Sequence, residues 1–192
     1  MKKRVHVVAF SGSLRTGSYN SAMIRIAQQV CPENMTIEVF DLAPIPLFNE
    51  DLRQAGQPAS VSELKERIAK ADSLLIAVPE YNYSMSGVLK NAIDWASRPI
   101  DTSPLNDKPV AIMGAGGRLG TARAQYHFRQ VAVFSNMHVM NRPEVFIAGA
   151  QDQFDEKGSP RSPEISERIK SLLIALADWT LRLGGQQGGE NS

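Results

Sequence analysis

The chain has 192 residues, of which 43% are hydrophobic, so it is long enough to bury one sizeable core as a single domain. Its 21 basic and 20 acidic residues leave a formal charge of +1, which provides no global field to attract nucleic acid or an anionic membrane. No stretch approaches the roughly 20 apolar residues that a membrane span needs. The one cysteine, Cys31, excludes an internal disulfide and favours a reducing cytoplasm.

Short β-branched runs alternate with helical patterns along the whole chain. The runs lack strict polar alternation, as expected of strands buried on both faces, and they cover residues 5–10, 36–40, 73–78, 110–113 and 145–147. The helical patterns cover residues 20–30, 62–71, 87–96, 121–134 and 162–183. Because parallel strands need crossover connections, this alternation predicts a doubly wound α/β fold, with helices on both faces of a parallel sheet.

The last helix carries start and stop signals. Ser162 suits the N-cap position, Pro163 suits the first helical position, and acidic residues follow in the first turn. Gly184 and Gly185 are expected to end the helix. Residues 1–185 are therefore predicted to form a single domain, and residues 186–192 a flexible tail with too few apolar side chains to fold.

Ligands of open parallel sheets bind beyond the carboxyl ends of the strands. Three predicted loops at these ends are unusual: residues 11–20 (SGSLRTGSYN), residues 79–87 (PEYNYSMSG) and residues 114–121 (GAGGRLGT). Segment 49–60 is a fourth polar stretch, expected to be a lid or a subunit contact. The candidate site is therefore expected at the first three loops.

The first loop has many hydrogen-bond donors and no carboxylate. Its hydroxyl groups and the Arg15 guanidinium stand before a helix start, where unpaired N–H groups favour an anion. A Walker loop is disfavoured because Ser18 occupies the position of the lysine, and the spacing of Gly12 and Gly17 does not make a dinucleotide fingerprint. The composition therefore favours a cradle for a monophosphate over a turn that only caps a helix.

The other two loops are suited to a flat, polar ring. The Asn82 amide can pair with a heterocycle edge and Tyr81 or Tyr83 can cover a ring, although this segment could equally be an ordinary turn. The glycines of the third loop allow bare backbone to approach a ligand closely.

Taken in order, the segments GSLRTGSYN, PEYNYSMSGVLKNAIDW and GAGGRLGTARAQYHFRQ resemble the NAD(P)H-dependent FMN reductases of flavodoxin-like fold. This group includes chromate and quinone reductases and azoreductase-type enzymes. The resemblance implies a five-stranded parallel sheet of order 2-1-3-4-5. Ser86 departs from the proline that is common in the family, and since serine can cap the following helix we expect altered loop rigidity without loss of flavin binding.

The resemblance also implies that FMN lies across the three loops. The residues expected around its phosphate are Ser11, Ser13, Arg15, Ser18, Tyr19 and Asn20. Those expected along the isoalloxazine ring are Pro79, Glu80, Tyr81 and Asn82. Those expected at the pyrimidine end are Gly114, Ala115, Gly116 and Gly117.

By the same resemblance, NADPH or NADH donates hydride to the flavin, which then reduces a small-molecule acceptor in a ping-pong mechanism. Quinones, free flavins, azo compounds and chromate are the expected acceptors, and no catalytic side chain and no metal are expected. The alternative is a flavodoxin-like electron carrier, which the near-neutral charge disfavours. A homodimer or homotetramer is expected, in which four residues line a substrate pocket or the interface: Tyr83, Arg123, Tyr126 and Glu144.

Overall fold

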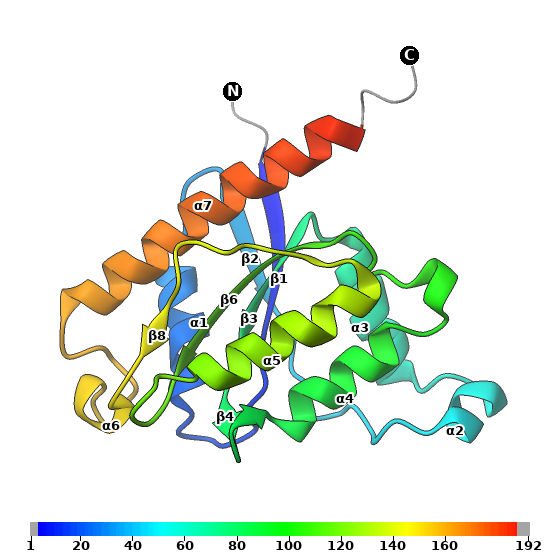
Figure 1. The fold of residues 1–192 in the computed structure, drawn as a ribbon, viewed down its shortest axis with the longest axis horizontal. Coiled ribbons are helices and arrows are strands. Elements are labelled where there is room, and N and C mark those ends of the chain that lie inside the picture. Colours follow the sequence, from blue (N-terminus) through cyan, green and yellow to red (C-terminus); the bar gives the residue numbers. More distant parts are fainter. Residues whose placement is uncertain (1–3, 188–192) are drawn as a thin grey trace.

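The structure is a computed structural model, and it describes residues 4–187. Four parallel strands form the centre of its sheet in the order β2-β1-β3-β6 (Figure 1). They are β1 (Val5–Ser11), β2 (Met35–Val39), β3 (Ser73–Ala77) and β6 (Pro109–Ala115). Every residue of β3 and β6 is buried, which explains why their sequences show no polar alternation.

The fifth position of the sheet is shared by two short strands. β7 (His138–Val139) pairs with the start of β6 at Pro109 and Val110, and β8 (Phe146–Ile147) pairs with its end. The predicted strand order and the flavodoxin-like fold are confirmed, but the sheet has six strands instead of five. Between β7 and β8 lies Pro143, which has no N–H to donate to a ladder.

The helices cover both faces of the sheet, and each face has its own hydrophobic core (Figure 1). The first face carries α1 (Tyr19–Gln29) and α7 (Pro163–Gln187). The second carries α3 (Ala59–Lys70), α4 (Gly87–Ala96) and α5 (Ala122–Ala132). The shorter elements are helices α2 (Glu50–Ala55) and α6 (Ala150–Gln153), 3-10 helices at Ile100–Thr102 and Val133–Ser135, and strands β4 (Glu80–Tyr81) and β5 (Ser84–Met85).

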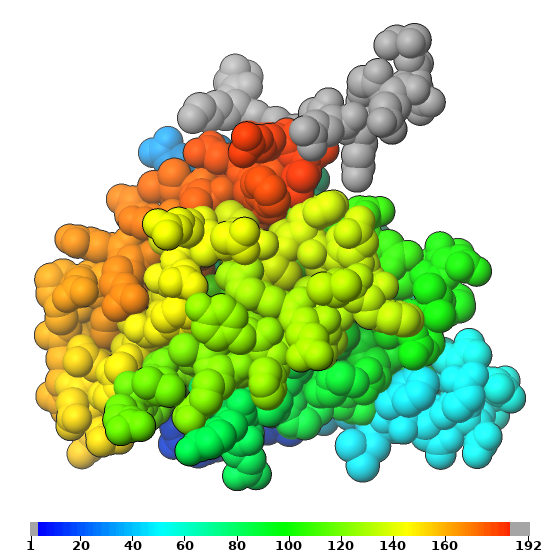
Figure 2. All heavy atoms as spheres, viewed as in Figure 1, coloured from blue at the N-terminus to red at the C-terminus, as the bar shows by residue number. Residues whose placement is uncertain are grey.

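Two predictions about local structure are wrong: the end of the last helix and the loop character of segment 49–60. Helix α7 continues through Gly184 and Gly185 to Gln187, because a glycine lowers helix stability but still has the N–H that continues the ladder. The segment 49–60 is not a simple loop, since it contains α2 and the start of α3, and α2 projects from the body of the molecule (Figure 2). Residues 188–192 of the predicted tail lie outside the described residues.

The carboxyl ends of β1, β3 and β6 lie at one edge of the sheet, with the loops that follow them (Figure 1, lower edge). Because β3 lies between β1 and β6, its loop stands between the other two. Over the residues that the structure describes, no helix is long and apolar enough to cross a membrane.

Candidate functional site

The first loop leaves several donors free. Within residues 4–187, the backbone amides of residues 14–17 donate to no acceptor of the chain, and these four residues are exposed. Ser18 is the N-cap of α1, and its Oγ accepts a hydrogen bond of 3.3 Å from the Ser21 amide. Arg15 makes no ion pair among the described residues, and its guanidinium carbon lies 5.3 Å from the ring centroid of Tyr19. The loop therefore caps its helix and also keeps donors available for an anion.

Ser86 locks the second loop to the first. Its hydroxyl donates to the Gly12 carbonyl at 2.6 Å and, as the N-cap of α4, accepts from the Leu89 amide at 3.2 Å. A Cβ on Gly12 would lie only 2.7 to 2.9 Å from atoms of Ser86, Leu89 and Pro79, so only glycine fits there. The expectation that serine caps this helix is confirmed.

The second loop is a tight hairpin. Strands β4 and β5 are joined by Asn82 and Tyr83, whose φ angles of 49° and 68° are both left-handed, as a type I′ turn requires. The Tyr81 hydroxyl lies 3.4 Å from Ser13 Oγ, so the hairpin reaches the first loop. Tyr81 and Tyr83 are 51% and 68% exposed, which leaves their rings accessible to a ligand.

Glu80 is not a free carboxylate. Its side chain is only 9% exposed and forms an ion pair with Arg123 of α5, whose Nε donates to Oε1 at 2.6 Å. Its other oxygen accepts a longer bond of 3.4 Å from the Ala124 amide in the first turn of α5. The Arg123 guanidinium carbon lies 3.6 Å from the ring centroid of Tyr83. The structure thus brings Glu80, Arg123 and Tyr83 into one stack.

The amides at the start of the third loop are already bonded. The amides of Gly114 and Gly116 donate to the carbonyls of Val145 and Ile147, both at 3.0 Å. A Cβ on either glycine would crowd Thr121, which is buried and left-handed, so both are packing positions. At Gly117 a Cβ would meet nothing within 4 Å. Gly117 is therefore the glycine of this loop that faces open space.

Asn20 joins the first loop to the third. Its side-chain amide donates to the Ala115 carbonyl at 2.9 Å, and its oxygen accepts from the Ala115 amide at 3.1 Å. Asn20 is 5% exposed, so this paired bond is shielded from water. Both polar atoms of its side chain are used within the chain, and the same bond fixes Ala115.

The four predicted pocket or interface residues fall into two places. Tyr83 and Arg123 are in contact, as described above. Burial lowers the pKa of the Arg129 guanidinium, and the charge of Glu144 opposes that shift. Tyr126 is 59% exposed on α5.

A hollow of about 330 Å³ lies between the second and third loops. Glu80, Asn82, Tyr83 and Arg123 line one side, and Gly117, Arg118, Leu119, Gly120 and Thr121 line the other. Arg118 and Leu119 were missed as site residues although they stand in the third motif, because a glycine-rich loop gives no sign of which side chains face a ligand. A second hollow, of about 310 Å³, includes Ser11 and Ser13.

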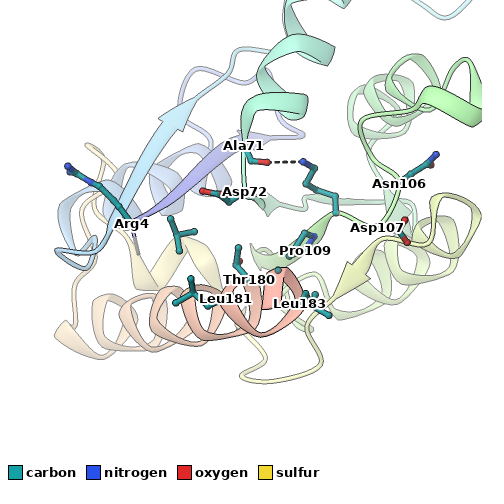
Figure 3. A pocket seen from close by; sticks show the side chains of 12 residues that line it. Arg4, Ala71, Asp72, Asn106, Asp107, Pro109, Thr180, Leu181 and Leu183 are labelled. Carbon is teal, nitrogen blue, oxygen red and sulfur yellow. Dashed lines mark hydrogen bonds between the residues drawn. The ribbon is translucent and has the colours of Figure 1, made fainter. Parts of the chain in front are cut away.

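A larger hollow, of about 580 Å³, lies at the opposite edge of the sheet (Figure 3). Its lining includes Arg4, Asp72, Asp107 and Thr180. Lys108 also lines it and donates to the Ala71 carbonyl at 2.7 Å. Burial lowers the pKa of the Lys108 ammonium. None of the predicted site residues lines this hollow.

Comparison with known proteins shows extensive similarity. Residues 5–152 match the family model described as NADPH-dependent FMN reductase. The chain is 52% identical to an NAD(P)H-dependent FMN reductase of Pseudomonas aeruginosa, over 96% of this chain and 100% of that protein. It is 43% identical to a quinone reductase of Escherichia coli, over 95% and 99% respectively. Among solved structures, the flavoenzyme FerB of Paracoccus denitrificans, an NAD(P)H:(acceptor) oxidoreductase, has a TM-score of 0.84 and 31% identity, covering 93% of this chain and 98% of that one.

Proposed function

We propose, from the premise that this chain belongs to the NADPH-dependent FMN reductase family, that it oxidises NAD(P)H and reduces quinones by a ping-pong mechanism. The predictions of the family, of an oxidoreductase and of FMN with NAD(P)H as cofactors are confirmed by this membership. The alternative of an electron carrier is not retained. Free flavins, azo compounds and chromate remain further acceptors within the proposal.

The observation that carries the proposal is the set of free donors in the first loop. FMN ends in a phosphate dianion, and the unpaired amides of residues 14–17, the unpaired Arg15 guanidinium and the start of α1 suit such a group. No acidic side chain stands in the first turn of α1 to oppose it. The donor set of this structure therefore fits the cofactor.

The residues proposed to hold FMN divide by loop. Ser11, Ser13, Arg15, Ser18 and Tyr19 surround the phosphate, and Asn20 holds Ala115 in place beside them. The loop of Pro79, Glu80, Tyr81 and Asn82 lines the ring. On the third loop, Gly117 supplies the open backbone, while Gly114 and Gly116 shape the turn by packing on Thr121.

When bound, FMN accepts hydride from a nicotinamide and passes the electrons to an acceptor. The protein's own contribution is to position both partners, because the one carboxylate that lines the described hollow is already paired. Glu80 is committed to Arg123, and His127 Nδ1 lies 2.9 Å from Ser84 Oγ outside the residues that line that hollow. Nicotinamide and acceptor are proposed to enter the same hollow in turn, so that the oxidised nicotinamide leaves before the acceptor binds, as in ping-pong kinetics.

We further propose a cytoplasmic homodimer or homotetramer. Tyr126 on α5 and the neighbouring Val133 and Phe134 are 59%, 76% and 58% exposed, a run of apolar surface that a second copy would cover. Tyr126 and Glu144, beside Arg129, are the polar groups proposed for this interface. Light scattering at low protein concentration tests the assembly, and a fully active monomer would contradict it.

The function is tested on the purified protein. It is expected to be yellow and to release FMN with little FAD on extraction, as chromatography of the cofactor would show. Initial rates at several acceptor concentrations are expected to give parallel double-reciprocal lines. We expect His127→Ala to keep hydride transfer within about tenfold of wild type, a smaller loss than removal of a general acid or base. A colourless protein that cannot be reconstituted with FMN would end the proposal.

A further inference from the structure

The turn at Asn82 and Tyr83 is unusual because of its second residue. Asparagine tolerates a left-handed φ, but a bulky aromatic side chain at φ 68° is an outlier. Glycine is the ordinary residue there. Such a conformation persists only where surrounding contacts hold it, and it is concentrated at functional sites.

The contact that holds Tyr83 is its stack on Arg123. The guanidinium carbon is 3.6 Å from the ring centroid, which is close enough for a cation–π interaction. One face of the ring is thereby covered, yet the side chain is 68% exposed. Tyr83 therefore presents an aromatic surface beside the hollow of about 330 Å³.

Arg123 is in turn held by Glu80. The Glu80 carboxylate is nearly buried and is bonded by the guanidinium and by the first turn of α5, where a negative charge is stabilised by the helix. A flexible arginine is thus fixed in one orientation. The buried carboxylate therefore holds the guanidinium, and the guanidinium holds the ring.

We propose that Glu80 is a positioning residue which, through Arg123, holds Tyr83 as a fixed aromatic wall that selects flat aromatic acceptors. This inference rests on the proposed function and adds what determines its acceptor preference. A quinone ring can stack on such a wall, whereas a compact anion such as ferricyanide gains nothing from it. The wall acts on the binding of flat rings that enter this hollow, the nicotinamide included.

The first test compares Glu80→Gln with wild type, using Glu66→Gln as the matched control, since Glu66 forms an exposed ion pair with Lys70 on α3. We expect Glu80→Gln to raise the KM for menadione by about three- to tenfold, the range of an aromatic stacking contact, with kcat nearly unchanged. The KM for ferricyanide is expected to stay within about twofold. Equal changes for both acceptors would overturn the inference.

The second test measures binding without turnover. Titration calorimetry gives the Kd of naphthol, a flat aromatic that accepts no hydride, on the oxidised holoenzyme. Tyr83→Phe is expected to bind like wild type and Tyr83→Gly about three- to tenfold more weakly. Because glycine suits the left-handed turn, Tyr83→Gly is also expected to melt no lower than wild type.

The outcomes separate the two proposals. A wild-type protein without FMN or NADPH oxidation defeats the proposed function. An active wild type, together with a Tyr83→Gly variant that binds naphthol unchanged, defeats only the aromatic wall. If Glu80→Gln fails to fold, the comparison of Tyr83→Phe with Tyr83→Gly still tests the aromatic wall, because neither variant disturbs a buried charge.

Discussion

The first and third loops of the site are both rich in small residues, but they differ in how many backbone amides are bonded where each loop leaves its strand. In the first loop, the amides of residues 14–17 have no acceptor among the described residues and face solvent. In the third, the amides of Gly114, Ala115 and Gly116 are all bonded within the chain. The comparison teaches that the third loop begins with a bonded stretch that supports the fold and becomes exposed only at residues 117–119, whereas the first loop exposes its amides from residue 14 onward.

The strongest test of this contrast is Gly114→Ala. The new methyl would crowd the Thr121 side chain and lie 2.7 Å from the Val78 carbonyl oxygen, neither of which can move without disturbing the sheet edge. We expect the free energy of unfolding to fall by about 3 kcal/mol, the upper range for overpacking. Chemical denaturation measures it, and an unchanged midpoint would mean that the third loop is not a rigid support.

Arg15→Ala probes the binding loop. We expect FMN binding to weaken by about 1.5–3 kcal/mol, the scale of a charge-assisted hydrogen bond, with little change in the stability of the apoprotein. Fluorescence titration of FMN gives the Kd. Arg182→Ala, on the exposed face of α7, is the matched control for loss of one positive charge. An unchanged Kd for Arg15→Ala would assign that guanidinium to solvent.

Asn20→Ala addresses the link between the two loops. The change leaves the backbone groups of Ala115 without their partners in a buried position, so we expect a loss of about 1–2 kcal/mol in the free energy of unfolding. Gln29→Ala, exposed on the same helix, is the control. If Asn20→Ala lowered FMN affinity alone and left stability intact, Asn20 would be a direct phosphate ligand.

The smallest effect on stability is expected for Gly117→Ala, which adds the same methyl group as Gly114→Ala. Since a Cβ at Gly117 meets nothing within 4 Å, the free energy of unfolding is expected to change by less than about 0.5 kcal/mol. Parallel denaturation curves of the two alanine variants provide the measurement. A large loss in Gly117→Ala would remove the distinction between the outward glycine and the packed ones.

The fold was largely predictable because its strands are buried on both faces and separated by helical patterns. What escaped prediction was short or locally ambiguous. Strand β7 has two residues, too few to show any periodicity, and the glycines at 184 and 185 permit either an end or a continuation of α7. Helix α2 buries no side chain, so it leaves no hydrophobic pattern to read.

The site was predictable as three loops but not as a set of contacts. Composition alone pointed to donors in the first loop and to bare backbone in the third. It could not reveal that Asn20 bonds Ala115 or that Glu80 bonds Arg123, because those pairs are 95 and 43 positions apart and depend on how the strands are ordered. The residue type shows which hydrogen bonds a side chain can make, and the fold determines which partner it meets.

The bond between Asn20 and Ala115 also has a consequence for how the protein is made. The first loop leaves the ribosome long before its anchor, since 95 positions separate the two residues. In the sheet, β3 lies between β1, which leads into the first loop, and β6, which ends at Ala115, so the bond needs β1, β3 and β6 in place. A nascent chain that ends before β6 therefore holds the donors of the loop without the anchor that fixes them. We therefore expect a chain that ends before β6 to bind FMN less tightly than the full chain.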